Sequence, residues 1–274
     1  PGWLQNKLKA IGLTPINNVV DITNYVLHET GQPLHAFDIA KIEGNKIVVT
    51  TLKNNTKFIT LDEMERKLSV TDLMICNVKK PMCIAGAFGG LHAGVTKNTK
   101  DIFLESAYFN PVSIRKTAKR HNLSTDASFR FERGCDPNIT VYALKRVVLL
   151  IAEIAGGKIA SEITDIYPSK IEHFKVALNY AKIDALIGEV IDRKAVKAIL
   201  TDLEIEIKKE TKEGLSLLVP PFKADVQREV DVIEEILRIY GFNTVAIPTK
   251  LNTSISSTEK VNPEEVRNTI ADLL

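Results

Sequence analysis

Cysteine, strong net charge and long apolar runs are what this sequence has least of. Its three cysteines are odd in number and lack CxxC spacing, so they support neither a disulfide framework nor a zinc site, and no other metal site is predicted. The net charge at pH 7 is only +2, so any contact with nucleic-acid phosphate must come from a local basic patch. The cysteine usage favours a reducing, cytoplasmic location.

No stretch of the sequence is long and apolar enough to predict a membrane span. The longest apolar run, Val147–Ala155, contains Glu153 and is far shorter than the roughly 20 residues that a bilayer requires. No signal or transit segment is recognisable at the start. We therefore expect no membrane contact. Because the chain starts at Pro1 and its residues from Asn262 onward look like an interrupted helix, we expect a piece excised from a longer protein.

The composition, with 45% hydrophobic and 26% charged residues over 274 positions, is that of a globular protein with one large or two modest domains. Hydrophobic spacing predicts helices at 3–11 and 18–30, a helix starting at 110–111, and a long helix from 136 to about 155. Alternating runs predict strands at 46–52, 57–61, 72–78, 81–88, 101–109 and 159–167. Between them, the segment 31–38 (GQPLHAFD) predicts a shaped turn that carries His35.

The second half of the chain has a different rhythm after a boundary expected at 168–170. Asn179 and Asp192 are predicted helix caps, a hairpin is predicted at 205–220, and a helix at 226–240. This order predicts a winged-helix-like module. Acidic residues at least match basic ones there, so a packing or spacer role is favoured over DNA binding. The expected fold class is α+β, with domains at 1–168 and 169–248, followed at 249–274 by a linker and the start of a helix.

The segment His121–Pro137 (HNLSTDASFRFERGCDP) carries the densest set of special residues. Aromatic and charged side chains alternate in it, after a small polar turn. We interpret it as a strand edge whose Arg130 and Arg133 either bind an anion or lie on a solvated face, and composition favours the solvated face. Ion pairing of these arginines with Glu132 or Asp136 is a further expectation.

Glu105 stands out because alternation in FLESAYF places it on the same strand face as Phe103 and Phe109. An ionised carboxylate without partners is costly to bury, so Glu105 is either at an exposed edge or faces a partner. The glycines of 86–90 predict either a weak phosphate loop or a close approach of the backbone to a ligand.

The helix that starts at 110–111 carries basic residues at three- and four-residue spacing. Arg115 and Lys119 belong to this stripe, which either holds a nucleic-acid backbone or forms a solvated face.

Four motifs together resemble the β subunit of bacterial phenylalanyl-tRNA synthetase: GLTPINNVVDITNYVLHETGQPLHAFD, GAFGGLHAGV, FLESAYF and RHNLSTDASFRFERGCDP. They look like its editing domain, and residues 172–247 are similar to its winged-helix-like domain. The resemblance implies hydrolysis of tyrosine from mischarged tRNA(Phe). It also implies contact with the 3′ end of tRNA(Phe), an α subunit in an α2β2 parent enzyme that uses ATP and Mg²⁺, and an aminoacylation site outside this chain.

The resemblance also implies roles for individual residues. Glu105 falls at the position that recognises the tyrosine phenol, and His35 falls beside the scissile ester. The pocket-wall positions are Gly89, Thr125 and Ala127, with Thr23 and Asn24 also at the site.

Residue chemistry agrees with these roles. A site built to hydrogen-bond the tyrosine hydroxyl rejects phenylalanine, since the buried carboxylate would then be unpaired. His35 acts either as a general base or by orienting water or ribose hydroxyls, and orientation is favoured. The rival hypotheses are a non-catalytic RNA-binding or subunit-docking module and a purely structural scaffold.

Overall fold

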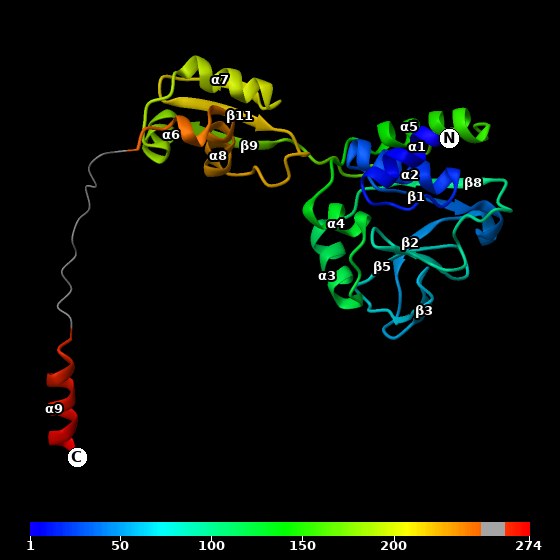
Figure 1. Cartoon of the computed structure of the whole chain (residues 1–274), viewed down its shortest axis with the longest axis horizontal. Helices are drawn as coiled ribbons and strands as arrows, with labels where there is room; N and C mark the ends of the chain where they lie inside the picture. Colours follow the sequence, from blue (N-terminus) through cyan, green and yellow to red (C-terminus); the bar gives the residue numbers. More distant parts are fainter. Residues whose placement is uncertain (248–260) are drawn as a thin grey trace.

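The structure is a computed structural model that describes residues 1–247 and 261–274. It is α+β, as expected, and its helices and antiparallel sheets form a larger unit followed by a smaller one (Figure 1). Of the predicted linker and helix start at 249–274, residues 249–260 lie outside the described residues. The helical pattern near the end is confirmed as α9 (Pro263–Leu273).

A two-stranded ribbon with two different faces lies at the centre of the larger unit. Strand β1 (Leu34–Asp38) pairs antiparallel with β8 (Ile102–Ser106). On one face, Leu34 and Leu104 pack against the apolar cluster of three helices, α1 (Gly2–Ala10), α2 (Asn18–Thr30) and α5 (Thr140–Ala155). The predicted helix at 18–30 is confirmed, and it begins at the Asn17 cap and ends at Gly31 in the left-handed conformation.

The other side of the ribbon faces a β-rich half. Here β2 (Val48–Thr51), β5 (Leu73–Cys76), β6 (Pro81–Ile84) and β7 (Phe88–Gly89) form a sheet in that order. The hairpin of β3 (Lys57–Ile59) and β4 (Glu65–Lys67) lies beside it, and two short 3-10 helices, η1 (Ile39–Lys41) and η2 (Glu43–Asn45), follow β1. Phe37 connects the two halves, because it is fully buried in the apolar cluster that includes Ile75 and Met82.

The segment His121–Pro137 corrects the sequence interpretation. It forms helix α4 (Asp126–Arg133), not a strand edge, and follows α3 (Pro111–His121). Thr125 caps α4 through a reciprocal pair of hydrogen bonds with Ser128, a helix-start signal that the alternation of aromatic and charged residues obscured.

The two arginines of α4 have partners within the helix. Arg133 pairs with Glu132 at 2.7 Å, as expected, and its guanidinium stacks 3.6 Å from the centroid of the Phe129 ring one turn earlier. Arg130 pairs with Asp126 and not with Asp136. The expectation that these residues hold an anion therefore loses its basis, since both charges are already met locally.

Helix α3 is fixed to the sheet by a buried carboxylate. Asp72 is fully buried and accepts hydrogen bonds from the Ser69 N–H at 2.8 Å and the Thr117 hydroxyl at 3.0 Å, and it also contacts Arg120 and His121. Burial alone would raise the pKa of this carboxyl, but the hydrogen bonds outweigh it and hold the pKa below its usual value.

The smaller unit has the predicted hairpin and one strand that the sequence did not reveal. Strands β10 (Glu206–Glu210) and β11 (Gly214–Val219) form the hairpin, and β9 (Phe174–Asn179) pairs with the free side of β11. Helices α6 (Tyr180–Ile187), α7 (Arg193–Asp202) and α8 (Glu229–Tyr240) pack on this sheet, and η3 (Phe242–Thr244) follows. The caps at Asn179 and Asp192 are confirmed.

The predicted strand at 159–167 is wrong. Residues 156–173 contain no helix or strand, and Ile159 and Ile166 are 75% and 81% exposed, so the apolar side chains of this stretch have no sheet to pack on. Among the described residues, no helix is both long enough and apolar enough to cross a membrane.

Candidate functional site

His35 and Glu105 lie directly opposite each other on the central ribbon. The register of β1 and β8 pairs His35 with Glu105 and Phe37 with Phe103. Residues paired in this way point to the same face of an antiparallel ribbon with their Cβ atoms about 5 Å apart. The prediction that His35 sits in a turn is corrected, because it lies in a strand. The short run LHAFD did not reveal this strand, since its partner lies about 70 residues further along the chain.

His35 and Glu105 share the face of the ribbon on its β-rich side, and this face with its neighbours is called the recess below. Leu34 and Leu104 point to the helical side, so the alternate residues His35 and Glu105 point away from it. Both side chains remain partly exposed. The His35 ring packs edge-on against Phe37, with ring centroids 4.5 Å apart, and this contact fixes its orientation.

The surroundings of His35 and Glu105 disfavour the charged form of each side chain. Burial raises the pKa of Glu105 to about 7 and lowers the pKa of His35 to about 4. At neutral pH His35 is therefore uncharged, and Glu105 is divided between its protonated and ionised forms. Burial is the cause of both shifts, so the Glu105 carboxyl has no cation holding it and can hydrogen-bond to a ligand.

Gly89 brings β7 against the His35 ring. A Cβ atom at position 89 would lie 3.1 Å from His35 Cε1 and 2.9 Å from Leu61 Cδ1, so only glycine fits without displacing a neighbour. The strand partner of Gly89 is Cys83, whose pKa is raised by burial and then by the charge of Glu105. Gly89 therefore packs against His35, which in turn faces Glu105 across the ribbon.

Thr125 and Ala127 lie at the start of α4. The Thr125 hydroxyl donates to the Ala87 carbonyl at 2.9 Å, which fixes the helix start beside β7. Ala127 packs on the apolar cluster that contains Phe37, the ring neighbour of His35. No described contact joins Thr125 or Ala127 to His35 or Glu105, so their place in the site stays a prediction.

The remaining predicted residues lie on helices. Thr23 and Asn24 are on α2, where Thr23 is buried and its hydroxyl donates to the Val20 carbonyl at 2.9 Å. No described contact joins them to His35 or Glu105, so their place in the site stays a prediction. Arg115 and Lys119 are exposed on α3 and stay a predicted RNA contact outside the recess.

Leu61 is the recess residue that sequence reasoning missed. It lies in the turn between β3 and β4, its N–H donates to the Gly89 carbonyl at 3.0 Å, and its side chain packs over Gly89. Nothing in the local pattern TLDEM marks it, because its role arises only from the fold. In the part of the chain that the structure describes, no group of three or more His, Cys, Asp or Glu residues is placed to hold a metal ion.

Two domain families and several known proteins are similar to this chain. Residues 1–156 match the B3/4 domain family, and residues 176–242 match the tRNA synthetase B5 domain. A phenylalanine–tRNA ligase β subunit of Bacteroides thetaiotaomicron is 56% identical over 275 residues, which cover 100% of this chain and 34% of that protein. The same subunit of Fusobacterium nucleatum is 41% identical over 277 residues, again covering 100% and 34%. The chain thus spans about a third of the length of these relatives.

A solved structure also matches over much of the chain. It is an N-terminal fragment of the phenylalanyl-tRNA synthetase β subunit from Pyrococcus horikoshii, with a TM-score of 0.39 and 14% identity. The match covers 81% of this chain and 65% of that one.

Proposed function

This chain belongs to the B3/4 domain family, in the form found in phenylalanine–tRNA ligase β subunits, and we propose that its larger unit is an editing site that hydrolyses tyrosyl-tRNA(Phe). The observation that carries the proposal is the pairing of His35 with Glu105 on one face of the ribbon, with Gly89 packed against the His35 ring. Such a face offers one group to read the amino-acid side chain and one to act at the ester.

Glu105 is proposed to select tyrosine. Its carboxylate accepts a hydrogen bond from the phenol hydroxyl, whereas a phenylalanine ring would leave this half-buried group unpaired. An unmade hydrogen bond of this kind costs about 1 to 3 kcal/mol, a factor of roughly 5 to 150. The correctly charged product is spared because its ring offers nothing to this carboxyl.

His35 is proposed to orient the attacking water or the ribose hydroxyl. A group with a pKa of about 4 is a weak base at neutral pH, so it abstracts a proton poorly. The uncharged ring nevertheless presents one N–H donor and one nitrogen acceptor, and the Phe37 contact holds it in place. An aminoacyl ester is already reactive, so positioning of water supplies much of the acceleration.

The same proposal includes the subunits, the tRNA and the aminoacylation site of a parent ligase. The chain would act within a cytoplasmic ligase that contains an α subunit, in an α2β2 assembly, and receives the 3′ end of tRNA(Phe). The aminoacylation site, with its ATP and Mg²⁺, would lie outside these residues. The unit at 176–242, which matches the tRNA synthetase B5 domain, would act as a packing or spacer module.

The exposed basic stripe of α3 favours one alternative. Arg115 and Lys119 fit an RNA-binding or subunit-docking module in which the recess no longer hydrolyses anything. Binding of tRNA without deacylation would support this second candidate.

The test is deacylation of tyrosyl-tRNA(Phe) by the assembled ligase. We expect His35→Ala to slow hydrolysis by about 10- to 100-fold, because the water loses its orientation. Glu105→Ala should weaken the preference for the tyrosyl ester. The matched control is Glu153→Ala, which removes an exposed carboxylate on α5 and should change neither rate. Wild-type rates in both recess variants would refute the editing function.

A further inference from the structure

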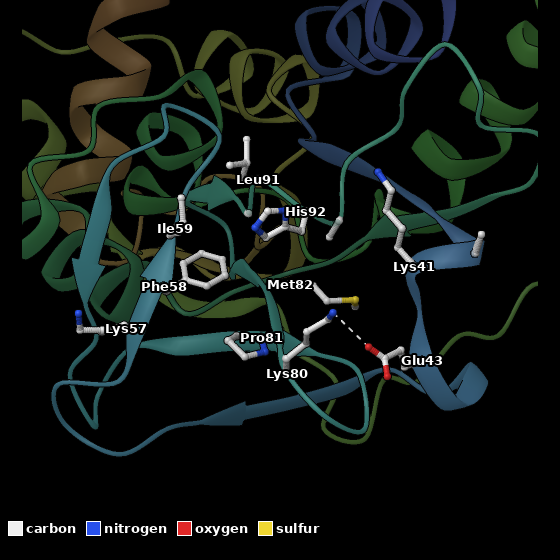
Figure 2. Close-up of a pocket in the computed structure, with 13 residues that line it drawn as sticks. Lys41, Glu43, Lys57, Phe58, Ile59, Lys80, Pro81, Met82, Leu91 and His92 are labelled. Carbon is white, nitrogen blue, oxygen red and sulfur yellow. Dashed lines mark ion pairs between the residues drawn. The ribbon is translucent and has the colours of Figure 1, made fainter.

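A hollow separate from His35 and Glu105 is lined by residues of β3 and β6 and by the segment 90–93. It is a cavity of about 470 Å³, within the range of small-molecule sites. Four basic side chains line it, Lys41, Lys57, Lys80 and His92, and Figure 2 shows Lys57 on the far side of Phe58 from Lys80 and Lys41. Phe58, Pro81 and Met82 supply its apolar surface. The cavity is thus suited to a ligand with both an anionic group and a flat apolar part.

The backbone segment Gly89–Gly94 lines the cavity and contacts strand β1. The segment starts at Gly89, against His35, and ends at Gly94, which forms an isolated bridge with Phe37. Gly90, Leu91, His92 and Ala93 line the cavity. A ligand in the cavity would therefore lie close to a group bound at His35.

The wall of the cavity is held in place by two contacts. The Lys41 ammonium donates to the Gly94 carbonyl at 2.8 Å, and the Gly90 N–H donates to the Met82 carbonyl at 2.9 Å. A Cβ atom at position 90 would lie 2.5 Å from that same carbonyl oxygen, so the wall has room only for glycine.

The lysines of the cavity can exchange their present partners for a phosphate. Lys80 shares the single Glu43 carboxylate with Lys79, at 3.1 and 2.7 Å, so two cations face one anion. Lys57 pairs with Glu65 at 3.0 Å, but its side chain is 69% exposed. Exposed pairs of this kind contribute about 0 to 1 kcal/mol, whereas a phosphate offers a stronger charge-assisted contact.

We propose that this cavity binds a nucleotide of the RNA strand whose terminal residue carries the ester, with Lys57 and Lys80 each on one of its two flanking phosphates and the nucleoside against Phe58 and Pro81. The proposal rests on the editing function, because that function brings the 3′ end of tRNA to His35. A free mononucleotide shares the same chemistry, and the experiment separates the two sources.

The perturbation is the double substitution Lys57→Ala/Lys80→Ala, at positions whose side chains are 69% and 58% exposed, so the fold is preserved. Loss of two phosphate contacts on single-stranded nucleic acid should reduce the slope of log affinity against log salt by about 1.4. Near 0.15 M salt, this corresponds to about tenfold weaker binding. The readouts are the affinity of the assembled ligase for uncharged tRNA(Phe) and the KM for deacylation of tyrosyl-tRNA(Phe).

The matched control is Lys9→Ala/Lys158→Ala, which removes two exposed lysines outside the cavity. We expect the cavity variant to raise KM about tenfold, with kcat and the preference for the tyrosyl ester retained, and the control variant to leave all three unchanged. An unaltered KM and salt slope in the cavity variant would overturn the proposal, even if Glu105→Ala behaves as an editing variant should.

Two further outcomes distinguish tRNA from a free nucleotide as the ligand, and the cavity proposal from the editing function. If AMP binds with an affinity that depends on these lysines while tRNA binding does not, the ligand is a free nucleotide and the RNA proposal is wrong. If the wild-type enzyme binds tRNA but does not deacylate it, the editing function fails. In that case the salt slope for uncharged tRNA alone tests the cavity proposal. A smaller slope in the cavity variant supports the proposal, and an unchanged slope overturns it.

Discussion

Gly89→Ala tests the recess at its tightest point. Gly89 is not in the left-handed region, so an alanine there adds no backbone strain, and its effect comes from the new Cβ atom alone. That atom would lie 2.9 Å from Leu61 Cδ1 and 3.1 Å from His35 Cε1. Leu61 is 44% exposed and can move aside, but His35 is confined by the Phe37 ring and must shift by a few tenths of an ångström.

The expected result is a loss of activity with little loss of stability. Misplacement of a reacting group by about 1 Å costs about 100-fold in rate, so a smaller shift should slow deacylation of tyrosyl-tRNA(Phe) by about tenfold. The free energy of unfolding should change by less than about 1 kcal/mol, which keeps Tm within about 4 °C of the wild type. Both quantities are measured on the same preparation, by single-turnover deacylation and by thermal unfolding.

Two neighbouring glycines supply the comparison. At Gly94 a Cβ atom would meet only Leu61 Cδ2, at 3.7 Å, which is an ordinary contact, so Gly94→Ala should alter neither rate nor Tm. At Gly90 it would meet the Met82 carbonyl oxygen at 2.5 Å, and Gly90→Ala should destabilise the fold by about 1 to 3 kcal/mol. Wild-type deacylation by Gly89→Ala, or an equal loss in Gly94→Ala, would refute this account of the recess.

Three other predictions concern pH, access and RNA contact. The pKa of Glu105 rises from 4.5 to about 7 on folding, so its contribution to the free energy of unfolding is lost as pH rises through that window. Glu105→Gln should therefore reduce the difference in the free energy of unfolding between pH 5 and pH 8, measured by urea titration. An unchanged pH dependence would contradict this prediction. Ala127→Trp should abolish deacylation, because a large side chain replaces the small one that packs on the cluster containing Phe37, with tRNA affinity retained as the control measurement. Arg115→Ala/Lys119→Ala should weaken tRNA binding and reduce its salt slope by about 1.4, whereas an unaltered slope assigns both residues to a solvated face.

Local signals in the sequence were enough for the capped helices. Asn110 and Pro111, Asn179, and Asp192 each mark a helix start whose cap forms within a few residues of the chain. The unusual position of Glu105 was also visible, because a carboxylate on an apolar strand face stands out by alternation alone. Alternation left open whether Glu105 is at an exposed edge or faces a partner. In the structure Glu105 is half-buried and faces His35 across the ribbon.

Strands that form only by pairing with residues far away in the chain could not be predicted from the sequence. Strand β1 exists because residues near 35 pair with residues near 105, and β9 exists because it pairs with β11, so their short sequences carry little signal alone. Helix α4 was mistaken for a strand because a charged and aromatic alternation over five residues fits both periods. Leu61 reaches Gly89 only through the β3–β4 turn. Its place in the recess is therefore a property of the tertiary structure.

The proposed role of Glu105 is tested most directly by the ratio of kcat/KM for deacylation of tyrosyl-tRNA(Phe) to that of phenylalanyl-tRNA(Phe). In Glu105→Ala this ratio should fall by about 5- to 150-fold, as expected for the loss of one hydrogen bond to the phenol worth about 1 to 3 kcal/mol. A ratio equal to that of the wild type would contradict the assignment of Glu105 as the group that recognises tyrosine.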